Sequence, residues 1–234
     1  MSRFTLLAVA TLILTLPLAG RGATWTEGVQ YARLTPPQQT SVGPGKVEVL
    51  EVFSYGCPAC NAFQPVMERM RHVLPANAQL VFLPAAFNPQ EDWPMFQRAY
   101  LAAQALGIAE RTHQAMYDAV WKTGELGIIA SGSNRLKDPL PSIADAARFY
   151  ARVGGVDAQK FLAMANSFSI DGKMRAADAQ IMAMHVDATP TLIVNGKYRV
   201  IRNELSNDQV LDLVKYLVAK EGGSESAPAG PAHP

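Results

Sequence analysis

The residues best suited to chemistry in this chain are its two cysteines, Cys57 and Cys60, which are separated by Pro58 and Ala59. They follow an apolar run at residues 47–53 and open a stretch whose apolar residues recur at helical spacing. Two thiols one helical turn apart, after a strand and at the start of a helix, are typical of thiol–disulfide chemistry. The sequence therefore predicts a redox-active pair.

The two thiols are expected to have different roles. Unpaired backbone N–H groups and the helix dipole favour negative charge at a helix N-terminus, so we expect Cys57 to ionise readily and act as the nucleophile. Cys60, one turn further along, is placed to resolve a mixed disulfide. A purely structural disulfide across so short a loop would constrain the unfolded chain little, and structural zinc normally needs four ligands.

A metal-carrying module is a hypothesis from a different class. Copper would be bound by Cys57 and Cys60 together with Met182, Met184 or His185. The plainer interpretation is that the two methionines pack at a helix end and His185 lies in an exposed loop. We therefore expect no metal and no cofactor other than the redox-active disulfide itself.

The N-terminus has the pattern of a secretory signal peptide, assigned to residues 1–22. Arg3 precedes an apolar run at residues 4–18, and small residues follow at 19, 20, 22 and 23. An uncleaved anchor is the alternative, although the apolar run is short for a membrane span. Cleavage predicts a periplasmic protein, in a compartment where disulfides form and persist.

The charge of the mature chain argues against nucleic acid as a partner. Cleavage removes Arg3 and Arg21 and no acidic residue, so a formal net charge of +1 becomes −1. A nearly neutral protein lacks the basic surface that nucleic acid requires. The polar segment before residue 46 is too short for a dimerisation domain, so we expect a monomer.

Residues 24–90 are predicted to form the first part of an α/β fold. An edge strand is expected near residues 30–34, a long strand at 46–54, a helix at 57–74 with Pro65 inside it, and a second buried strand at 77–86. Glu51 shares one face of the long strand with large apolar residues. We expect this carboxyl group to be buried with a raised pKa, where it could transfer protons as the disulfide forms or breaks.

The pattern then changes to helices alone at residues 91–184, which predicts a helical insertion. We expect helices at residues 93–106 (capped by Asp92), 110–122, 142–152 (capped by Ser142 and ended by glycines), 157–166 and 171–184 (begun by Asp171). Residues 185–220 return to the first fold with a hairpin turning at Asn195-Gly196 and a final helix. Residues 221–234 are predicted to be a disordered tail.

Thr189 and Pro190 end the loop before the hairpin. A proline at the first residue of a strand removes no needed hydrogen bond, and either peptide isomer is compatible with this position. If the hairpin pairs with the strand at 46–54, Pro190 faces Cys57.

From about residue 28 to 220 the chain resembles the DsbA-type periplasmic thiol:disulfide oxidoreductases, which have a thioredoxin fold with an inserted all-helical domain. The resemblance rests on separated motifs in the right order: Phe53-Ser54-Tyr55-Gly56-Cys57-Pro58-Ala59-Cys60, Pro65, the helical insertion, and Thr189-Pro190 before Val194-Asn195-Gly196-Lys197-Tyr198.

The resemblance implies a role for each site residue. Cys57 would be an exposed nucleophile that passes its disulfide with the buried Cys60 to newly exported proteins. Pro190 would be cis, Thr189 would offer backbone hydrogen bonds to an extended substrate, and Glu51 would be the buried acid. The implied partners are unfolded secreted proteins and a membrane quinone-linked reoxidase of the DsbB type.

Three departures from the family pattern concern charge. Ala59 stands where the best-known members carry His, Gln64 where many carry an acid, and an apolar residue near Phe82 where a lysine is common. We therefore expect a weaker oxidant than the best-known members, with fewer charged groups around Glu51. An exported reductase or isomerase on the same scaffold is the alternative function.

Overall fold

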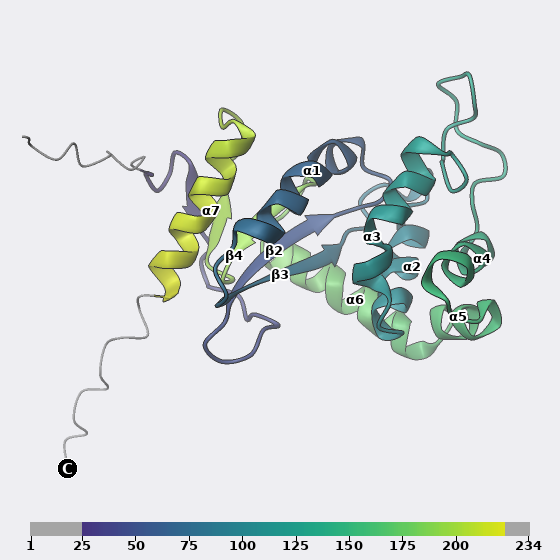
Figure 1. The fold of residues 1–234 in the computed structure, drawn as a ribbon, viewed down its shortest axis with the longest axis horizontal. Helices are drawn as coiled ribbons and strands as arrows, with labels where there is room; N and C mark the ends of the chain where they lie inside the picture. The colour runs from purple at the N-terminus through teal and green to yellow at the C-terminus, as the bar shows by residue number, and fades with distance from the viewer. Residues whose placement is uncertain (1–24, 223–234) are drawn as a thin grey trace, which may run out of the picture.

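The computed structural model describes residues 25–222, which form a mixed five-stranded sheet with helices on both faces (Figure 1). The strand order is β1-β5-β4-β2-β3, with β3 parallel to β2 and the other pairs antiparallel. The strands are β1 (Tyr31–Arg33), β2 (Val47–Phe53), β3 (Ala78–Pro84), β4 (Thr191–Val194) and β5 (Tyr198–Val200). The strands expected from the sequence are thus all present.

Alternation along β2 divides the core between two helical layers. Val49 points toward α1 (Pro58–Val73) and α7 (Asn207–Gly222), which cover one face of the sheet. Leu50 and Val52 point toward α6 (Phe168–Ala183), which lies along the opposite face (Figure 1). Glu51, two residues from Val49, therefore lies on the α1 side of the sheet.

The insertion between β3 and β4 consists of helices and loops, as expected, with one isolated β-bridge between Ile129 and Leu136 in its longest loop. It contains η1 (Pro89–Glu91), α2 (Trp93–Ala105), α3 (Ala109–Tyr117), the π-helical turn η2 (Asp118–Lys122), α4 (Ile143–Gly154), α5 (Ala158–Ala165) and α6. Its core also includes Phe53, Tyr55, Cys57 and Cys60. The cysteine segment is therefore packed into the helical part as well as lying at the end of the sheet.

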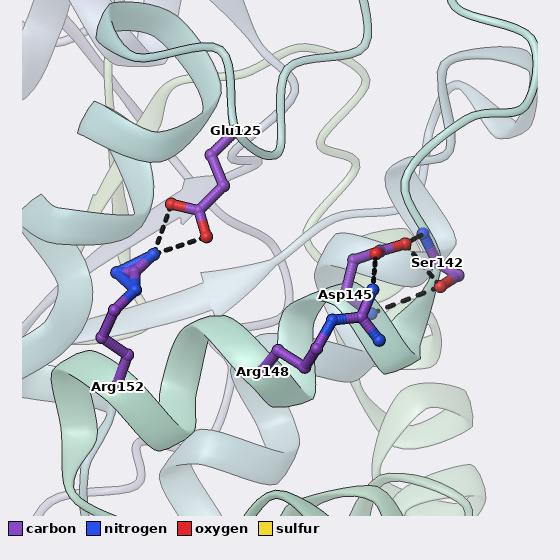
Figure 2. A network of polar contacts seen from close by, with 5 residues as sticks. All are labelled: Glu125, Ser142, Asp145, Arg148 and Arg152. Carbon is purple, nitrogen blue, oxygen red and sulfur yellow. Dashed lines mark hydrogen bonds and ion pairs between the residues drawn. The ribbon is translucent and has the colours of Figure 1, made fainter.

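The start of α4 shows how local sequence fixes a helix end, and the predicted cap is confirmed (Figure 2). The Ser142 hydroxyl oxygen accepts a bond from the Asp145 N–H at 3.3 Å, and the Asp145 carboxylate accepts one from the Ser142 N–H at 2.8 Å. Two otherwise unpaired donors are satisfied reciprocally. At the other end of α4, Arg152 pairs with Glu125 in the preceding loop.

One predicted capping bond is absent and one predicted helix start is wrong. α2 begins at Trp93 after Asp92, as predicted, but the Asp92 side chain makes no capping bond and its backbone is left-handed with φ of 59°. The last inserted helix begins at Phe168 rather than Asp171, because the Ser167 hydroxyl oxygen caps it by accepting from the Ile170 N–H at 3.3 Å. Asp171 instead lies in the first turn, where the helix dipole favours an acid.

A third helix was predicted as one piece over residues 110–122. It divides into α3 and η2, because the backbone changes to π-helical pairing after Tyr117.

The assignment of Glu221 and Gly222 to the tail is also wrong, because α7 continues through Gly222. The Glu221 side chain is buried and accepts hydrogen bonds from Asn195 at 2.7 Å and from Lys197 at 2.5 Å. These two residues belong to the β4–β5 turn, so the end of α7 holds the hairpin. Residues 223–234 and the predicted signal peptide at 1–22 lie outside the described residues.

Replacing Glu221 should test this anchoring. We expect Glu221→Ala to lower the free energy of unfolding by about 1–3 kcal/mol, because the partly buried side chains of Asn195 and Lys197 lose their acceptor. Urea denaturation at pH 7 measures the change. Glu204→Ala removes an exposed acid from the neighbouring loop and serves as the control. Equal stability of the two variants would contradict the anchoring of the hairpin by Glu221.

Candidate active site

The first cysteine lies at the N-terminus of α1, as predicted. Cys57 is the N-cap residue with extended backbone angles, and its sulfur accepts a hydrogen bond from the Cys60 N–H at 3.3 Å. Pro58 occupies the first turn, where its missing N–H removes no helical bond. Both cysteines are free thiols, and the exposed Pro58 and Ala59 lie between them.

The loop before β4 covers Cys57 from the other side. Because β4 pairs with β2, it brings Thr189 to the redox segment, and the Cys57 thiol donates to the Thr189 carbonyl oxygen at 3.5 Å. The Thr189–Pro190 peptide bond is cis, which confirms what the resemblance implied. The expectation of an exposed Cys57 is wrong in degree: its exposed fraction is 4%, against 0% for Cys60, because this loop and the helical core enclose it.

The surroundings of the two thiols separate their acidities. A hydrogen bond from the Cys60 thiol, together with the N–H groups of Cys60 and Ala59, lowers the pKa of Cys57 from 9.0 to about 6, against the opposing effect of burial. Burial raises the pKa of Cys60 far above its ordinary range. One sulfur therefore ionises at neutral pH while the other keeps its proton.

Glu51 lies buried below this pair, as predicted. Its exposed fraction is 0%, and neither carboxyl oxygen has a hydrogen-bond partner among the described residues. Its neighbours across the sheet are apolar: Phe82 on β3 and Leu192 on β4. Burial raises the pKa of Glu51 to about 8, while the charge of Arg202 opposes the shift.

Arg202 is a site residue that sequence reasoning missed. It follows β5 by two positions and is half-buried, with its guanidinium carbon 4.1 Å from the centre of the Phe63 ring on α1. Its charge acts on Glu51, Cys60 and Cys57. No local pattern marks it, since a cation after a hairpin strand ordinarily lies in water.

A second missed group supports the backbone just before Cys57. The buried Tyr55 hydroxyl shares a hydrogen bond of 2.9 Å with His113 Nδ1, and burial lowers the pKa of His113 to about 3. Trp121 donates to the Tyr55 carbonyl oxygen at 2.8 Å. A Cβ on Gly56 would lie 2.7 Å from Trp93 Nε1, so only glycine fits here without displacing the indole. The helical part thus fixes the entry into the redox segment.

The other predicted residues lie away from this centre or add no charge to it. Gln64 is buried and neutral. Met184 is buried under the opposite face of the sheet, and Met182 and His185 are exposed, so Met182 does not pack as predicted. The structure thus does not bring the two methionines together with the cysteines. Within residues 25–222, no group of three or more His, Cys, Asp or Glu side chains is arranged to hold a metal.

Known proteins share this arrangement over nearly the whole chain. A family model described as thioredoxin matches residues 44–215. The thiol:disulfide interchange protein DsbA of Pseudomonas aeruginosa is 36% identical over 217 residues, which cover 92% of this chain and 93% of that protein. The chain belongs to the DsbA family of thiol:disulfide interchange proteins. It is therefore a protein thiol:disulfide oxidoreductase.

Solved structures agree with this membership. The crystal structure of Pseudomonas aeruginosa DsbA superposes with a TM-score of 0.72 at 35% identity and covers 87% of this chain and 97% of that chain. The oxidoreductase DsbA from Xylella fastidiosa gives 0.73 at 29% identity, with coverage of 85% and 98%. The predicted thioredoxin fold with a helical insertion is confirmed.

The ionisation of Cys57 can be followed directly by thiolate absorbance at 240 nm in the reduced protein. We expect a midpoint at about pH 6. Cys57→Ser should abolish the transition, while Cys60→Ala should move the midpoint upward because it removes the thiol that donates to the sulfur. An unshifted midpoint in Cys60→Ala would contradict the role given to that hydrogen bond.

Glu51 should make stability depend on pH. The folded protein keeps this carboxyl protonated up to about pH 8, whereas the unfolded chain releases the proton near pH 4.5. Stability therefore falls as pH rises through this window. We expect Glu51→Gln to raise the free energy of unfolding of the oxidised protein by about 2–3 kcal/mol at pH 7.

The control for this prediction is the same pair of proteins at pH 4, where both states hold the proton and the gain should largely vanish. Denaturant unfolding of the oxidised form is used because its cysteines do not titrate. A pH-independent difference between the variant and the parent would mean that folding does not raise the pKa of Glu51.

Proposed function

We propose that the protein is exported to the periplasm and donates a Cys57–Cys60 disulfide to newly exported, unfolded proteins. The observation that carries this proposal is the placement of Cys57 at the N-terminus of α1, where its sulfur accepts the Cys60 N–H, with Cys60 fully buried beside it. This placement lowers the pKa of Cys57 and raises that of Cys60. An ionised Cys57 stabilises the reduced form, which makes the disulfide the form that gives up its bond readily.

The first step is attack on Cys57. A client thiolate attacks the Cys57 sulfur, a client–Cys57 disulfide forms, and the electron pair of the broken Cys57–Cys60 bond leaves on Cys60. Cys60 then needs a proton because burial disfavours its charge. Glu51, whose pKa of about 8 leaves it mostly protonated at pH 7, is placed to supply that proton and later recover one from water.

The second step releases the client. A second client thiolate attacks the client sulfur of the mixed disulfide, the client disulfide forms, and Cys57 leaves as a thiolate. The client has lost two electrons and the protein has gained them. The N–H groups of Ala59 and Cys60 stabilise the charge on the departing sulfur.

The substrate would be bound beside this pair. We assign substrate positioning to the cis loop at Thr189 and Pro190, whose backbone lies against the sulfur. The exposed Phe87 ring, 6.4 Å from Trp93, offers apolar surface to an unfolded client. We propose that a membrane quinone-linked reoxidase of the DsbB type restores the disulfide, and that catalysis needs no other cofactor. No helix within residues 25–222 is long and apolar enough to span a membrane.

The magnitude of the thiolate effect sets the expected oxidising power. A pKa of about 6 leaves Cys57 about ten parts ionised to one at pH 7. This ionisation stabilises the reduced form by about 1.4 kcal/mol, equivalent to about 30 mV for a two-electron couple. The contribution is moderate, in keeping with Ala59 in place of a cationic neighbour.

A glutathione redox titration tests the function. We expect a potential at pH 7 clearly above that of thioredoxin, about −270 mV, and a value near −270 mV would contradict the donor role. The potential should fall by about 30 mV per pH unit above pH 6, where reduction takes up one proton, and by about twice that below. The oxidised protein should also oxidise a reduced two-cysteine peptide, and Cys57→Ser should not.

A further inference from the structure

Glu51 lies in surroundings that give its charge no local support. It is fully buried, its neighbours in the sheet are Phe82 and Leu192, and neither of its oxygens is hydrogen-bonded among the described residues. At pH 7 Glu51 is mostly protonated, so the thiolate of Cys57 is the negative charge that this enclosed end of the sheet must hold. A negative charge in a desolvated region is costly without a cation nearby.

Arg202 supplies a cation at this place. Its guanidinium lies over the Phe63 ring, and Phe63 follows Cys60 by three residues on α1, so ring and thiol lie on one side of the helix. One guanidinium nitrogen, Nη1, is buried and has no hydrogen-bond partner within the described structure. The group is therefore held by its contact with an aromatic face and is not neutralised by a hydrogen-bonded carboxylate.

Arg71 on α1 lies 6.0 Å from the centre of the Phe82 ring, but it is paired with Glu68 and Glu110. Among the described residues, the other titratable groups that act on Glu51 or the thiols carry no positive charge. Tyr100 on α2 and Tyr117 on α3 interact electrostatically with Glu51, and burial raises the pKa of both. His113 is kept neutral by burial. Arg202 is thus the cation that the structure brings to the dithiol from outside the redox segment.

We propose that Arg202 is a positioning residue of the redox centre, whose fixed charge favours the Cys57 thiolate and so sets how oxidising the disulfide is. It reaches the centre from the segment after β5, whereas the neighbour of Glu51 on β3 is the apolar Phe82. Since an arginine stays ionised throughout the working pH range, the support is constant while Cys57 and Glu51 titrate.

Arg202→Gln tests the proposal because it removes the charge and keeps a polar side chain. We expect the Cys57 ionisation midpoint of the reduced protein to rise by about one pH unit. At pH 7 the equilibrium constant for reduction of the disulfide by glutathione should then fall about fivefold. Arg202→Lys, which keeps the charge, should recover most of both changes.

Arg69→Gln is the matched control. Arg69 lies on α1 and is exposed, and its partner is Asp208, so this variant removes one positive charge without touching the dithiol. We expect neither the midpoint nor the equilibrium constant to change. If Arg202→Gln does not fold, Arg202→Met, which keeps an apolar contact with Phe63, gives the same test.

Measuring the free energy of unfolding of the oxidised variants separates an effect of Arg202 on the redox equilibrium from an effect on stability alone. The proposal is overturned if a neutral variant at position 202 keeps the parent midpoint and equilibrium constant, whatever its stability. It is also overturned if Arg69→Gln produces the same shifts. Either result would leave the disulfide-donor function intact, because that function rests on the potential of the unaltered protein.

Discussion

A single negative charge, on the sulfur of Cys57, is what the surrounding structure must accommodate. The sulfur lies at the N-terminus of α1, where the N–H groups of Ala59 and Cys60 point toward it. These donors are effective because the site is largely enclosed, and hydrogen bonds to a charge gain strength when water is excluded. The same enclosure disfavours ionisation of Cys60 and Glu51. One environment therefore produces both the reactive thiol and its protonated neighbours.

The layers of the fold each contribute one wall of this site. β2 delivers the redox segment, β4 brings the cis loop across from it, and α1 provides the donors. The helical insertion holds the backbone before Cys57 through Tyr55, which bonds to His113 and accepts from Trp121. α7 acts at a distance by fixing the hairpin turn through Glu221. The site thus depends on contacts that join segments far apart in the sequence.

Features with a local cause could be predicted from the sequence. Cys57 caps a helix because a strand, a turn and Pro58 precede the helical pattern, and Asn195 and Gly196 form the hairpin turn because both adopt positive φ, 52° and 63°. Glu51 was predictable as buried from strand alternation alone. Arg202 and His113 were not, because their roles come from tertiary packing. The start of α6 could not be predicted because Ser167, Ser169 and Asp171 are all possible caps, and local sequence does not rank them.

The shared core of Cys57, Cys60 and the inserted helices has a practical consequence for protein engineering. Grafting the four-residue motif onto a smaller scaffold that lacks those helices would move the sulfurs without their enclosure, and water would then screen the nearby dipoles. Such a chimera would be expected to behave as a common dithiol. The redox potential of the Cys57–Cys60 pair therefore depends on the whole folded chain and would not be transferred with the four residues alone.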